Sequence, residues 1–354
     1  MRSAAGQDLY VCRTLHIDCS ILKALAEASL SRTASSIESL DYALIISGAP
    51  TNSRYDLIHG VIDKLQSAVP PSDPQANPND ACPLTEQNTP ELADDRNLAS
   101  AHCTVPRILP PSLAAFQSDM FRCPFIISGY AKHWPALREH PWRRSSYLRS
   151  VAGPGRVVPI EVGEHYMVEN WNQRIMSWDE FLSMLDFEDQ PTRTQPDEKH
   201  YLAQHDLFIQ FPALRNDILI PDYAYATNFD CDFPGYRPPA NEERIISHVW
   251  LGPEHTISPA HTDPYNNLFV QVVGHKTVWL APPSTSEIMT SRTRSLQNTS
   301  PYDVFGDVDE IFRRNVAPHA MTAVLNPGDL LYFPVGWWHA MRSESTSFSL
   351  SLWF

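Results

Sequence analysis

The residues with the clearest chemistry in this chain are His261 and Asp263, considered together with His339. Imidazole nitrogens and carboxylate oxygens are common ligands of divalent metals. Alternate side chains of an extended strand lie on one face, so His261 and Asp263 can reach a single ion while Thr262 points away. His339 must then come from another strand. The pattern predicts a three-ligand site that leaves half of an octahedral ion open, which is typical of non-haem iron centres.

Lys276 follows the His261 motif by fifteen residues and begins the next predicted strand. A 2-oxo acid that chelates the metal carries a second carboxylate, which needs a fixed cation inside the fold. Lys276 is the candidate for that cation. The alternative interpretation is a turn lysine at the solvated end of its strand, because lysine is mostly exposed.

A second His-x-Asp sequence, His16-Ile17-Asp18, shows that this short pattern proves little alone. A helix-like run follows it at residues 21–30. Asp18 or Ser20 is therefore interpreted as the N-cap of that helix, and His16 as a surface side chain.

The surroundings of the 261–263 motif predict short β-strands instead. Val, Ile, Phe and Trp are enriched in several segments that are bounded by Gly and Pro turns. These segments are 244–251, 267–273, 276–281, 321–325, 329–333 and 345–354. In the last of them, large apolar residues alternate with serines, which predicts a strand with one face in a core. Many short strands with such turns predict a mainly β fold, a sandwich or jelly roll.

Longer segments carry a family resemblance: PSLAAF (111–116), GYAKHWPAL (129–137), VPIEVGEHY (158–166), YLAQHDLF (201–208), WLGPEHTISPAHTDPYNNLFVQVVGHKTVWL (250–280) and LNPGDLLYFPVGWWHAMRS (325–343). They resemble the Jumonji-C (JmjC) family of iron- and 2-oxoglutarate-dependent oxygenases, in the branch of Jumonji-C domain-containing protein 5, of the arginyl hydroxylase or lysine demethylase 8 type. The resemblance implies a double-stranded β-helix, a cupin-like jelly roll with flanking helices. It also implies Fe(II) as the metal, with 2-oxoglutarate and O₂ as cosubstrates.

Carried over position by position, the resemblance assigns three sets of residues. The iron ligands of the family match His261, Asp263 and His339. The positions that hold 2-oxoglutarate match Lys276, Tyr201, Ser258 and Asn267. The positions that surround a cationic substrate side chain match Glu161, Tyr166, Gln204 and Trp250.

The implied substrate pocket suits arginine. A carboxylate such as Glu161 can bind a guanidinium in a bidentate fork, and an aromatic face such as Trp250 adds a cation–π contact. The alternatives for these positions are a solvated turn for Glu161 and ordinary core packing for Trp250.

The resemblance therefore implies an enzyme that hydroxylates a protein side chain, with arginine as the predicted target and succinate and CO₂ as coproducts. Demethylation of histone methyllysine is an alternative, because it uses the same iron chemistry and differs only in the carbon presented to the metal. A non-catalytic cupin-like binding protein is a second alternative. Loss of a metal ligand or of the cosubstrate lysine would favour that last possibility, and neither is lost here.

Composition limits the partners. The formal net charge of −14 argues against direct binding of nucleic acid or an anionic membrane, and it suits a basic substrate that contains arginine or lysine, such as a histone or ribosomal protein. No long apolar run predicts a membrane span or a signal peptide, so we expect a nuclear or cytoplasmic protein. The six cysteines show no C-x-x-C spacing and are interpreted as free thiols. The oligomeric state is left open.

Changes in composition along the chain predict three regions. Residues 1–69 contain helix-like runs and form a helical N-terminal extension, either a partner-binding module or a cover for the catalytic part. Residues 70–104 are rich in Pro, Asn and Asp and are predicted to be a flexible acidic linker. Residues 105–354 form the predicted JmjC catalytic domain.

Overall fold

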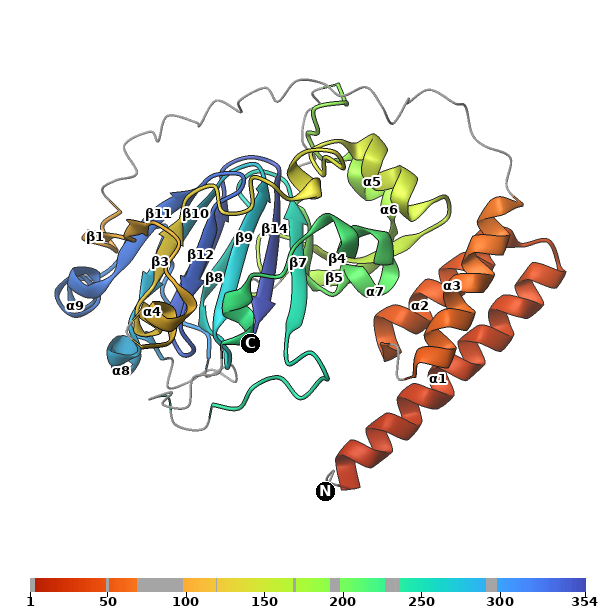
Figure 1. Ribbon diagram of the computed structural model, residues 1–354, viewed down its shortest axis with the longest axis horizontal. Helices are drawn as coiled ribbons and strands as arrows, with labels where there is room; N and C mark the ends of the chain where they lie inside the picture. Colours follow the sequence, from red (N-terminus) through yellow and green to blue (C-terminus); the bar gives the residue numbers. More distant parts are fainter. Residues whose placement is uncertain are drawn as a thin grey trace.

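Two β-sheets build the C-terminal part of the molecule, and three helices at the N-terminus pack beside it (Figure 1). The computed structural model describes residues 4–48, 51–68, 98–118, 120–167, 170–191, 198–226, 233, 236–290 and 298–354. The smaller sheet has the order β1 (Cys103–Thr104), β11 (Met321–Leu325), β10 (Lys276–Ala281), β13 (Trp338–Ser343) and β8 (Ile257–Thr262). The larger sheet has the order β2 (Arg107–Ile108), β3 (Phe125–Ile127), β12 (Leu330–Phe333), β9 (Asn267–Val273), β14 (Ser347–Trp353), β7 (Ile246–Gly252), β6 (His200–His205), β4 (Val157–Val162) and β5 (Asn172–Ser177).

An apolar core holds the two sheets together. Phe269 and Leu331 from the larger sheet pack in one buried cluster with Val278 and Leu325 from the smaller sheet. Strands that are buried on both faces read as near-continuous apolar runs, and this explains why β9 and β10 are so rich in Val, Leu, Phe and Trp. The mainly β, cupin-like jelly roll predicted from the sequence is confirmed.

Strand β14 corrects one expectation. The alternation of serines with apolar residues predicted a single buried face, but all seven residues of β14 are buried. The serine face lies inside the barrel, where Ser349 Oγ donates to Gln271 Oε1 at 2.8 Å and Ser351 Oγ donates to Asn267 Oδ1 at 2.6 Å. A polar face can be buried when each hydroxyl finds such a partner, and alternation alone does not reveal it.

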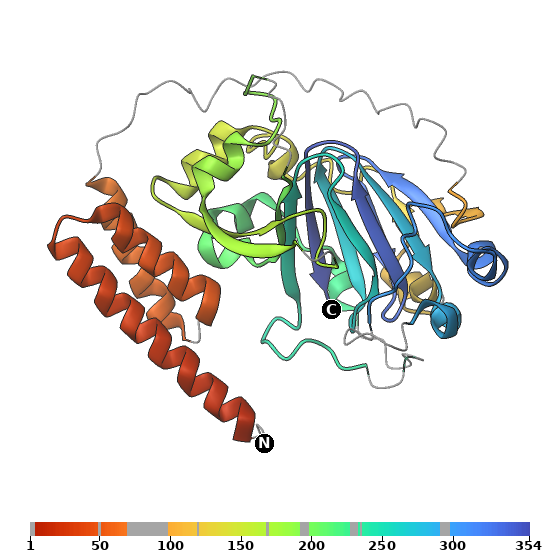
Figure 2. The same cartoon turned by 180° about the vertical axis from the view of Figure 1, so that it is seen from behind.

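Short helices cover the sheets. These are α4 (Leu113–Ser118), α5 (Ser145–Ala152), α6 (Trp178–Ser183), α7 (Leu207–Gln210), α8 (Ser286–Met289) and α9 (Glu310–Asn315). Figures 1 and 2 place α5, α6 and α7 around β4 and β5, between the sheets and the N-terminal helices. At the opposite end, Phe312 of α9 packs against Trp279 and Trp338 of the smaller sheet.

The N-terminal helices are α1 (Ala4–Ser29), α2 (Thr33–Ser47) and α3 (Asn52–Ser67). They share a small apolar core that includes Ile17, Leu40 and Ile58. The N-cap interpretation of Asp18 was wrong. Helix α1 begins well before this residue, and the Asp18 carboxylate lies within it, where it accepts hydrogen bonds from Arg54 of α3 at 2.6 and 2.8 Å.

The predicted linker boundary at residue 104 also needs correction. Residues 98–104 pack against the smaller sheet, because β1 pairs in parallel with β11 and Trp279 Nε1 donates to Ser100 O at 3.0 Å. The folded C-terminal region therefore begins no later than Leu98. Residues 70–97, for which flexibility was predicted, lie outside the described residues.

Four of the six cysteines are free and exposed: Cys12, Cys19, Cys103 and Cys123. Cys82 and Cys231 lie outside the described residues. No helix in the described part of the chain has the length and apolarity that a membrane crossing requires.

Candidate metal centre and its pocket

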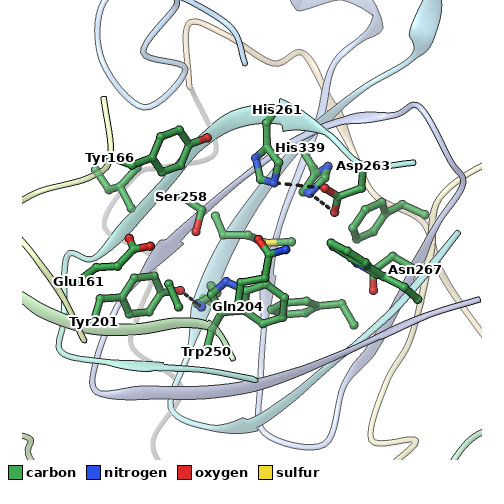
Figure 3. Close-up of a pocket in the computed structure, with 17 residues that line it drawn as sticks. Glu161, Tyr166, Tyr201, Gln204, Trp250, Ser258, His261, Asp263, Asn267 and His339 are labelled. Carbon is green, nitrogen blue, oxygen red and sulfur yellow. Dashed lines mark hydrogen bonds and ion pairs between the residues drawn. The ribbon is translucent and has the colours of Figure 1, made fainter. Parts of the chain in front are cut away.

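Two neighbouring antiparallel strands bring the predicted metal ligands together. His261 of β8 and His339 of β13 are direct cross-strand partners, and Asp263 follows β8 immediately (Figure 3). The carboxylate of Asp263 places Oδ1 3.7 Å from His261 Nε2 and Oδ2 3.3 Å from His339 Nε2. One ligand atom from each of the three residues lies within 4.8 Å of the others. Three donors therefore converge on one point.

The outer nitrogens of both imidazoles face carbonyl groups. His261 Nδ1 lies 2.8 Å from Pro259 O, and His339 Nδ1 lies 3.1 Å from Trp337 O. A carbonyl oxygen can only accept, so each Nδ1 carries a proton and donates it. In a neutral ring this leaves the lone pair on Nε2, the atom that faces Asp263. A backbone carbonyl that fixes the tautomer is the usual support of a metal-bound histidine.

The charge states also fit a divalent metal. Burial, assisted by the nearby His339, lowers the pKa of His261 to about 4, so this imidazole is neutral at physiological pH. Burial alone would raise the pKa of Asp263, but the two histidines outweigh it and lower the pKa below its usual value. Imidazole nitrogens from two histidines and one carboxylate form the donor set that suits Fe(II). The residues present thus fit the metal that the resemblance implied.

Lys276 lies at the start of β10 with its side chain inside the barrel rather than in solvent, and 1% of the residue is exposed. Its Nζ donates to Tyr201 Oη at 3.3 Å, and it lies 5.7 Å from the ring centres of Tyr201 and Phe269. Burial lowers the pKa of Lys276 to about 7. No carboxylate pairs with it among the residues that the structure describes. A buried ammonium without a counterion is a receptor for an anionic group.

The other predicted cosubstrate residues border the same space. Asn267 begins β9, and its Oδ1 accepts from Ser351, so its amide nitrogen is available as a donor. Ser258 and His261 lie three residues apart on β8, a spacing that would normally place them on opposite faces. One extra residue on β8, opposite His339–Met341 of β13, forms a bulge that lets both line the pocket.

Buried and half-buried residues alternate along β4. Glu161 projects from the half-buried face, opposite the buried apolar side chains. Trp171 Nε1 donates to Glu161 Oε2 at 3.2 Å. Burial raises the pKa of Glu161, although the hydrogen bonds from Trp171 and Gln173 oppose this effect. Tyr166 lies close by and its pKa is likewise raised by burial (Figure 3).

Gln204 and Trp250 come from the neighbouring strands β6 and β7. Trp250 is half-buried, with its ring centre 6.2 Å from that of Phe269. Gln204 is exposed and has a positive φ of 47°. It lies where the β6–β7 register shifts between Leu202 and His205, so its direction is set by a bulge.

All eleven predicted site residues line one pocket, between the ligand strands of the smaller sheet and β4, β6 and β7 of the larger sheet (Figure 3). Their individual roles stay predictions. The pocket also has lining residues that the sequence analysis did not name: Ala203, Ile257, Phe269, Phe333, Met341 and Trp353. Apolar residues on strands look like ordinary core in a sequence. For Met341, the period-2 spacing from His339 was an available signal.

The jelly roll, with two histidines and one carboxylate converging from adjacent strands, defines a protein of the cupin class with a candidate metal site. A family model described as a cupin-like domain matches residues 120–354. The chain is 38% identical to Jumonji C domain-containing protein 5 of Drosophila melanogaster over 72% of this chain and 61% of that protein. It is 39% identical to Lysine-specific demethylase 8 of Danio rerio over 71% of this chain and 58% of that protein.

A plant protein, Lysine-specific demethylase JMJ30 of Arabidopsis thaliana, is 34% identical over 69% of this chain and 53% of its own length. The chain thus spans little more than half the length of the curated relatives it matches. Together, the family model and these relatives show that the chain belongs to the cupin-like JmjC family.

Proposed function

We propose that this protein is an Fe(II)- and 2-oxoglutarate-dependent oxygenase that hydroxylates an arginine side chain of a protein or peptide. Membership of the JmjC family and the convergence of His261, Asp263 and His339 support the metal chemistry. Bound there, Fe(II) would supply the activation of O₂ that couples oxidation of 2-oxoglutarate to succinate and CO₂ with insertion of oxygen into a C–H bond. The chain's own residues then determine which molecules bind and which carbon is presented.

Lys276 supports the assignment of the cosubstrate. Its protonated amine has three N–H donors, and the one to Tyr201 leaves two for the distal carboxylate of 2-oxoglutarate. Asn267 and Ser258 add donors at the wall of the same pocket. The distal carboxylate, once paired with Lys276, also excludes water from the ammonium group. This strengthens the attraction between the two charges in a low-dielectric interior.

The environment of Glu161 is the observation that supports the arginine assignment. Its carboxylate is largely buried at the pocket, yet no lysine or arginine pairs with it among the described residues. Burial of an unpaired carboxylate is costly, so the site favours a cationic guest. A guanidinium can donate two parallel hydrogen bonds to Glu161 while its plane lies against Trp250. Gln204 can accept a further N–H.

The substrate class follows from charge. The formal net charge of −14 attracts basic segments, so we propose a basic protein or peptide as the partner. Demethylation of methyllysine is the second candidate, and it is favoured by the name of the zebrafish relative, Lysine-specific demethylase 8. A trimethylammonium group has no N–H to offer Glu161, however, and mono- and dimethylammonium groups lack the planar pair of parallel N–H donors, so the pocket chemistry favours a guanidinium.

The decisive experiment incubates the protein with Fe(II), 2-oxoglutarate, air and peptides that contain arginine or methyllysine, followed by mass spectrometry and succinate detection. A gain of one oxygen on arginine would establish the hydroxylase. Loss of a methylene from methyllysine would replace it with the demethylase. Succinate with neither change would confirm the use of 2-oxoglutarate, but it would refute the choice of these peptides as substrates. Absence of succinate would favour a non-catalytic binding protein.

Glu161→Gln supplies the residue-level test. This substitution keeps the shape and removes the charge, so we expect loss of peptide hydroxylation with retention of peptide-independent succinate formation. Glu164→Gln is the matched control, because Glu164 is exposed and three residues away. Equal hydroxylation by the Glu161→Gln protein and the wild type would contradict the pocket assignment.

A further inference from the structure

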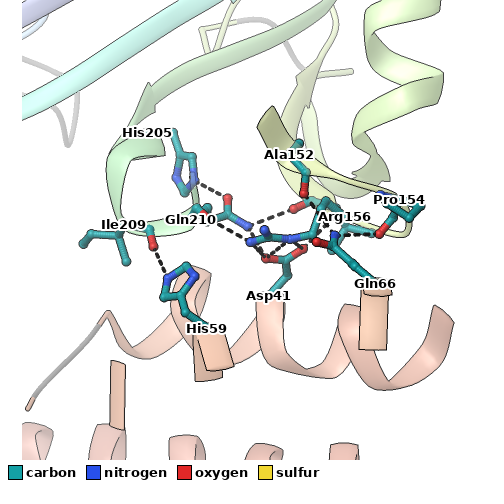
Figure 4. A network of polar contacts seen from close by, with 10 residues as sticks. Asp41, His59, Gln66, Ala152, Pro154, Arg156, His205, Ile209 and Gln210 are labelled. Carbon is teal, nitrogen blue, oxygen red and sulfur yellow. Dashed lines mark hydrogen bonds and ion pairs between the residues drawn. The ribbon is translucent and has the colours of Figure 1, made fainter. Parts of the chain in front are cut away.

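A buried polar network joins the N-terminal helices to strand β6 (Figure 4). Its centre is Asp41 of α2, which is completely buried. The carboxylate accepts from Arg156 Nε at 2.9 Å and Nη2 at 2.6 Å, from Val157 N at 2.9 Å and from Gln210 Nε2 at 2.8 Å. A buried carboxylate with this many donors has one low-energy position, because any movement leaves a charge unpaired.

The orientation of Gln210 extends the network by one step. Its Nε2 donates to Asp41 and to Val157 O at 3.0 Å. Both partners are acceptors, so the amide is fixed with Oε1 facing His205. The 2.6 Å contact between His205 Nε2 and Gln210 Oε1 is then a hydrogen bond donated by the imidazole. Burial lowers the pKa of His205, which is consistent with a neutral ring.

The relay from Asp41 through Gln210 to His205 ends at a strained point of the pocket. Between Leu202 and His205, β6 has one residue more than the paired stretch of β7, and the bulge places Ala203 and Gln204 in the pocket wall. Gln204 has a φ of 47°. A left-handed conformation is unfavourable for a residue with a side chain, so the surroundings must hold it. His205, the next residue, is the anchor nearest to the bulge.

We propose that the Asp41–Gln210–His205 relay is a positioning device through which the N-terminal helices hold the β6 bulge and present Gln204 to the substrate. The inference rests on the proposed function in that Gln204 is taken as a substrate contact. It assigns a role to α1–α3 beyond covering the domain. Gln210 and His205 act through Gln204, and neither touches the cosubstrate side of the pocket.

Gln210→Met in the full-length protein breaks the relay while the buried Asp41–Arg156 pair stays in place. With Fe(II), 2-oxoglutarate and an arginine peptide, we expect the KM for the peptide to rise about fivefold to tenfold, the effect of one mispositioned hydrogen bond. The KM for 2-oxoglutarate and peptide-independent succinate formation should not change. An unchanged peptide KM would overturn the proposal.

Gln66→Met is the matched control. Gln66 of α3 crosses the same interface, where Nε2 donates to Ala152 O at 3.0 Å and Pro154 O at 2.9 Å, but it has no connection to β6. The substitution makes the same chemical change and removes two hydrogen bonds across the interface, both to backbone carbonyls. An equal rise in peptide KM in the two variants would mean general loosening of the interface, and it would refute the relay.

Hydrogen–deuterium exchange tests the relay without any substrate. Backbone amides of residues 201–206 should exchange faster in Gln210→Met than in the wild type, and at the wild-type rate in Gln66→Met. If the wild type fails to hydroxylate arginine, the proposed function is wrong, and the exchange data alone decide the relay. Equal protection of residues 201–206 in all three proteins would overturn it.

Discussion

Replacement of Lys276 by methionine is expected to stabilise the ligand-free protein and to remove most of the stabilisation by 2-oxoglutarate. The amine is buried and burial lowers its pKa from 10.5 to about 7. The unfolded chain holds that proton up to its ordinary pKa, so folding costs on the order of 4 kcal/mol at pH 7 through this group. Methionine has a similar length and no charge. Allowing for imperfect packing, Lys276→Met should stabilise the ligand-free protein by about 1–3 kcal/mol.

The cosubstrate favours the wild type. Loss of one member of a buried, hydrogen-bonded charge pair costs about 2–5 kcal/mol, which corresponds to an increase of roughly 30-fold to several thousand-fold in Kd. At 2-oxoglutarate concentrations about 100 times the wild-type Kd, the wild type gains about 2.7 kcal/mol, or roughly 5–10 °C in Tm. Lys276→Met should gain less than about 1 kcal/mol at the same concentration.

Thermal unfolding in the presence of Mn(II), with and without 2-oxoglutarate, measures both effects without turnover. Lys132→Met is the control, because Lys132 is exposed and the same charge is removed. A Lys276→Met protein that is less stable without ligand and keeps the full 2-oxoglutarate shift would refute the reasoning. Another cation would then hold the distal carboxylate, and the buried amine would have a structural role.

Three further outcomes follow from the site and the fold. His261→Ala should abolish metal binding, measured by Mn(II) electron paramagnetic resonance, with unchanged circular dichroism; an active variant would remove the metal assignment. The affinity for 2-oxoglutarate should fall by up to tenfold per pH unit as the pH rises above about 7, because the carboxylate binds only the protonated form of Lys276. Titration calorimetry from about pH 6.5 to 9 would measure this decrease, and an affinity that does not change with pH would contradict the prediction. Gly274→Ala should lower the free energy of unfolding by at least about 2 kcal/mol, because Gly274 has a φ of +68° and a Cβ there would collide with Thr346 O. A denaturant unfolding curve identical to that of the wild type would disprove this prediction.

The sequence predicted the elements whose signal is local. Strands β9 and β10, which follow the His261 motif, have the apolar, β-branched composition of buried strands. The two-residue spacing of His261 and Asp263 indicates that they share one face. The residues of the metal centre therefore needed little more than strand pairing to be placed. The predicted start of the first helix failed because an aspartate inside a helix looks like an N-cap until its partner, Arg54, is known.

The substrate side of the pocket depends on information that no local pattern contains. Gln204 reaches the pocket through a bulge, and a bulge is a property of two paired strands rather than of one sequence. Asp41 and Arg156 are 115 residues apart and neither stands in a recognisable motif. Only the resemblance to a known family identified Gln204, and nothing in the sequence identified the relay behind it.

The metal ligands and the residues predicted to contact the substrate come from different sheets, whereas the predicted cosubstrate residues come from both. His261, His339 and Lys276 lie on or next to β8, β13 and β10 of the smaller sheet, whereas Glu161, Gln204 and Trp250 lie on β4, β6 and β7 of the larger sheet.

Because the metal ligands lie on or next to strands of the smaller sheet, substitutions of Glu161, Gln204 or Trp250 can change the guest without removing a metal ligand. Hydroxylation and demethylation differ in the carbon that reaches the metal, and in the proposed function the residues that position this carbon lie on the larger sheet. The choice between them should therefore follow β4, β6 and β7, together with the N-terminal helices that hold β6, and not the metal ligands.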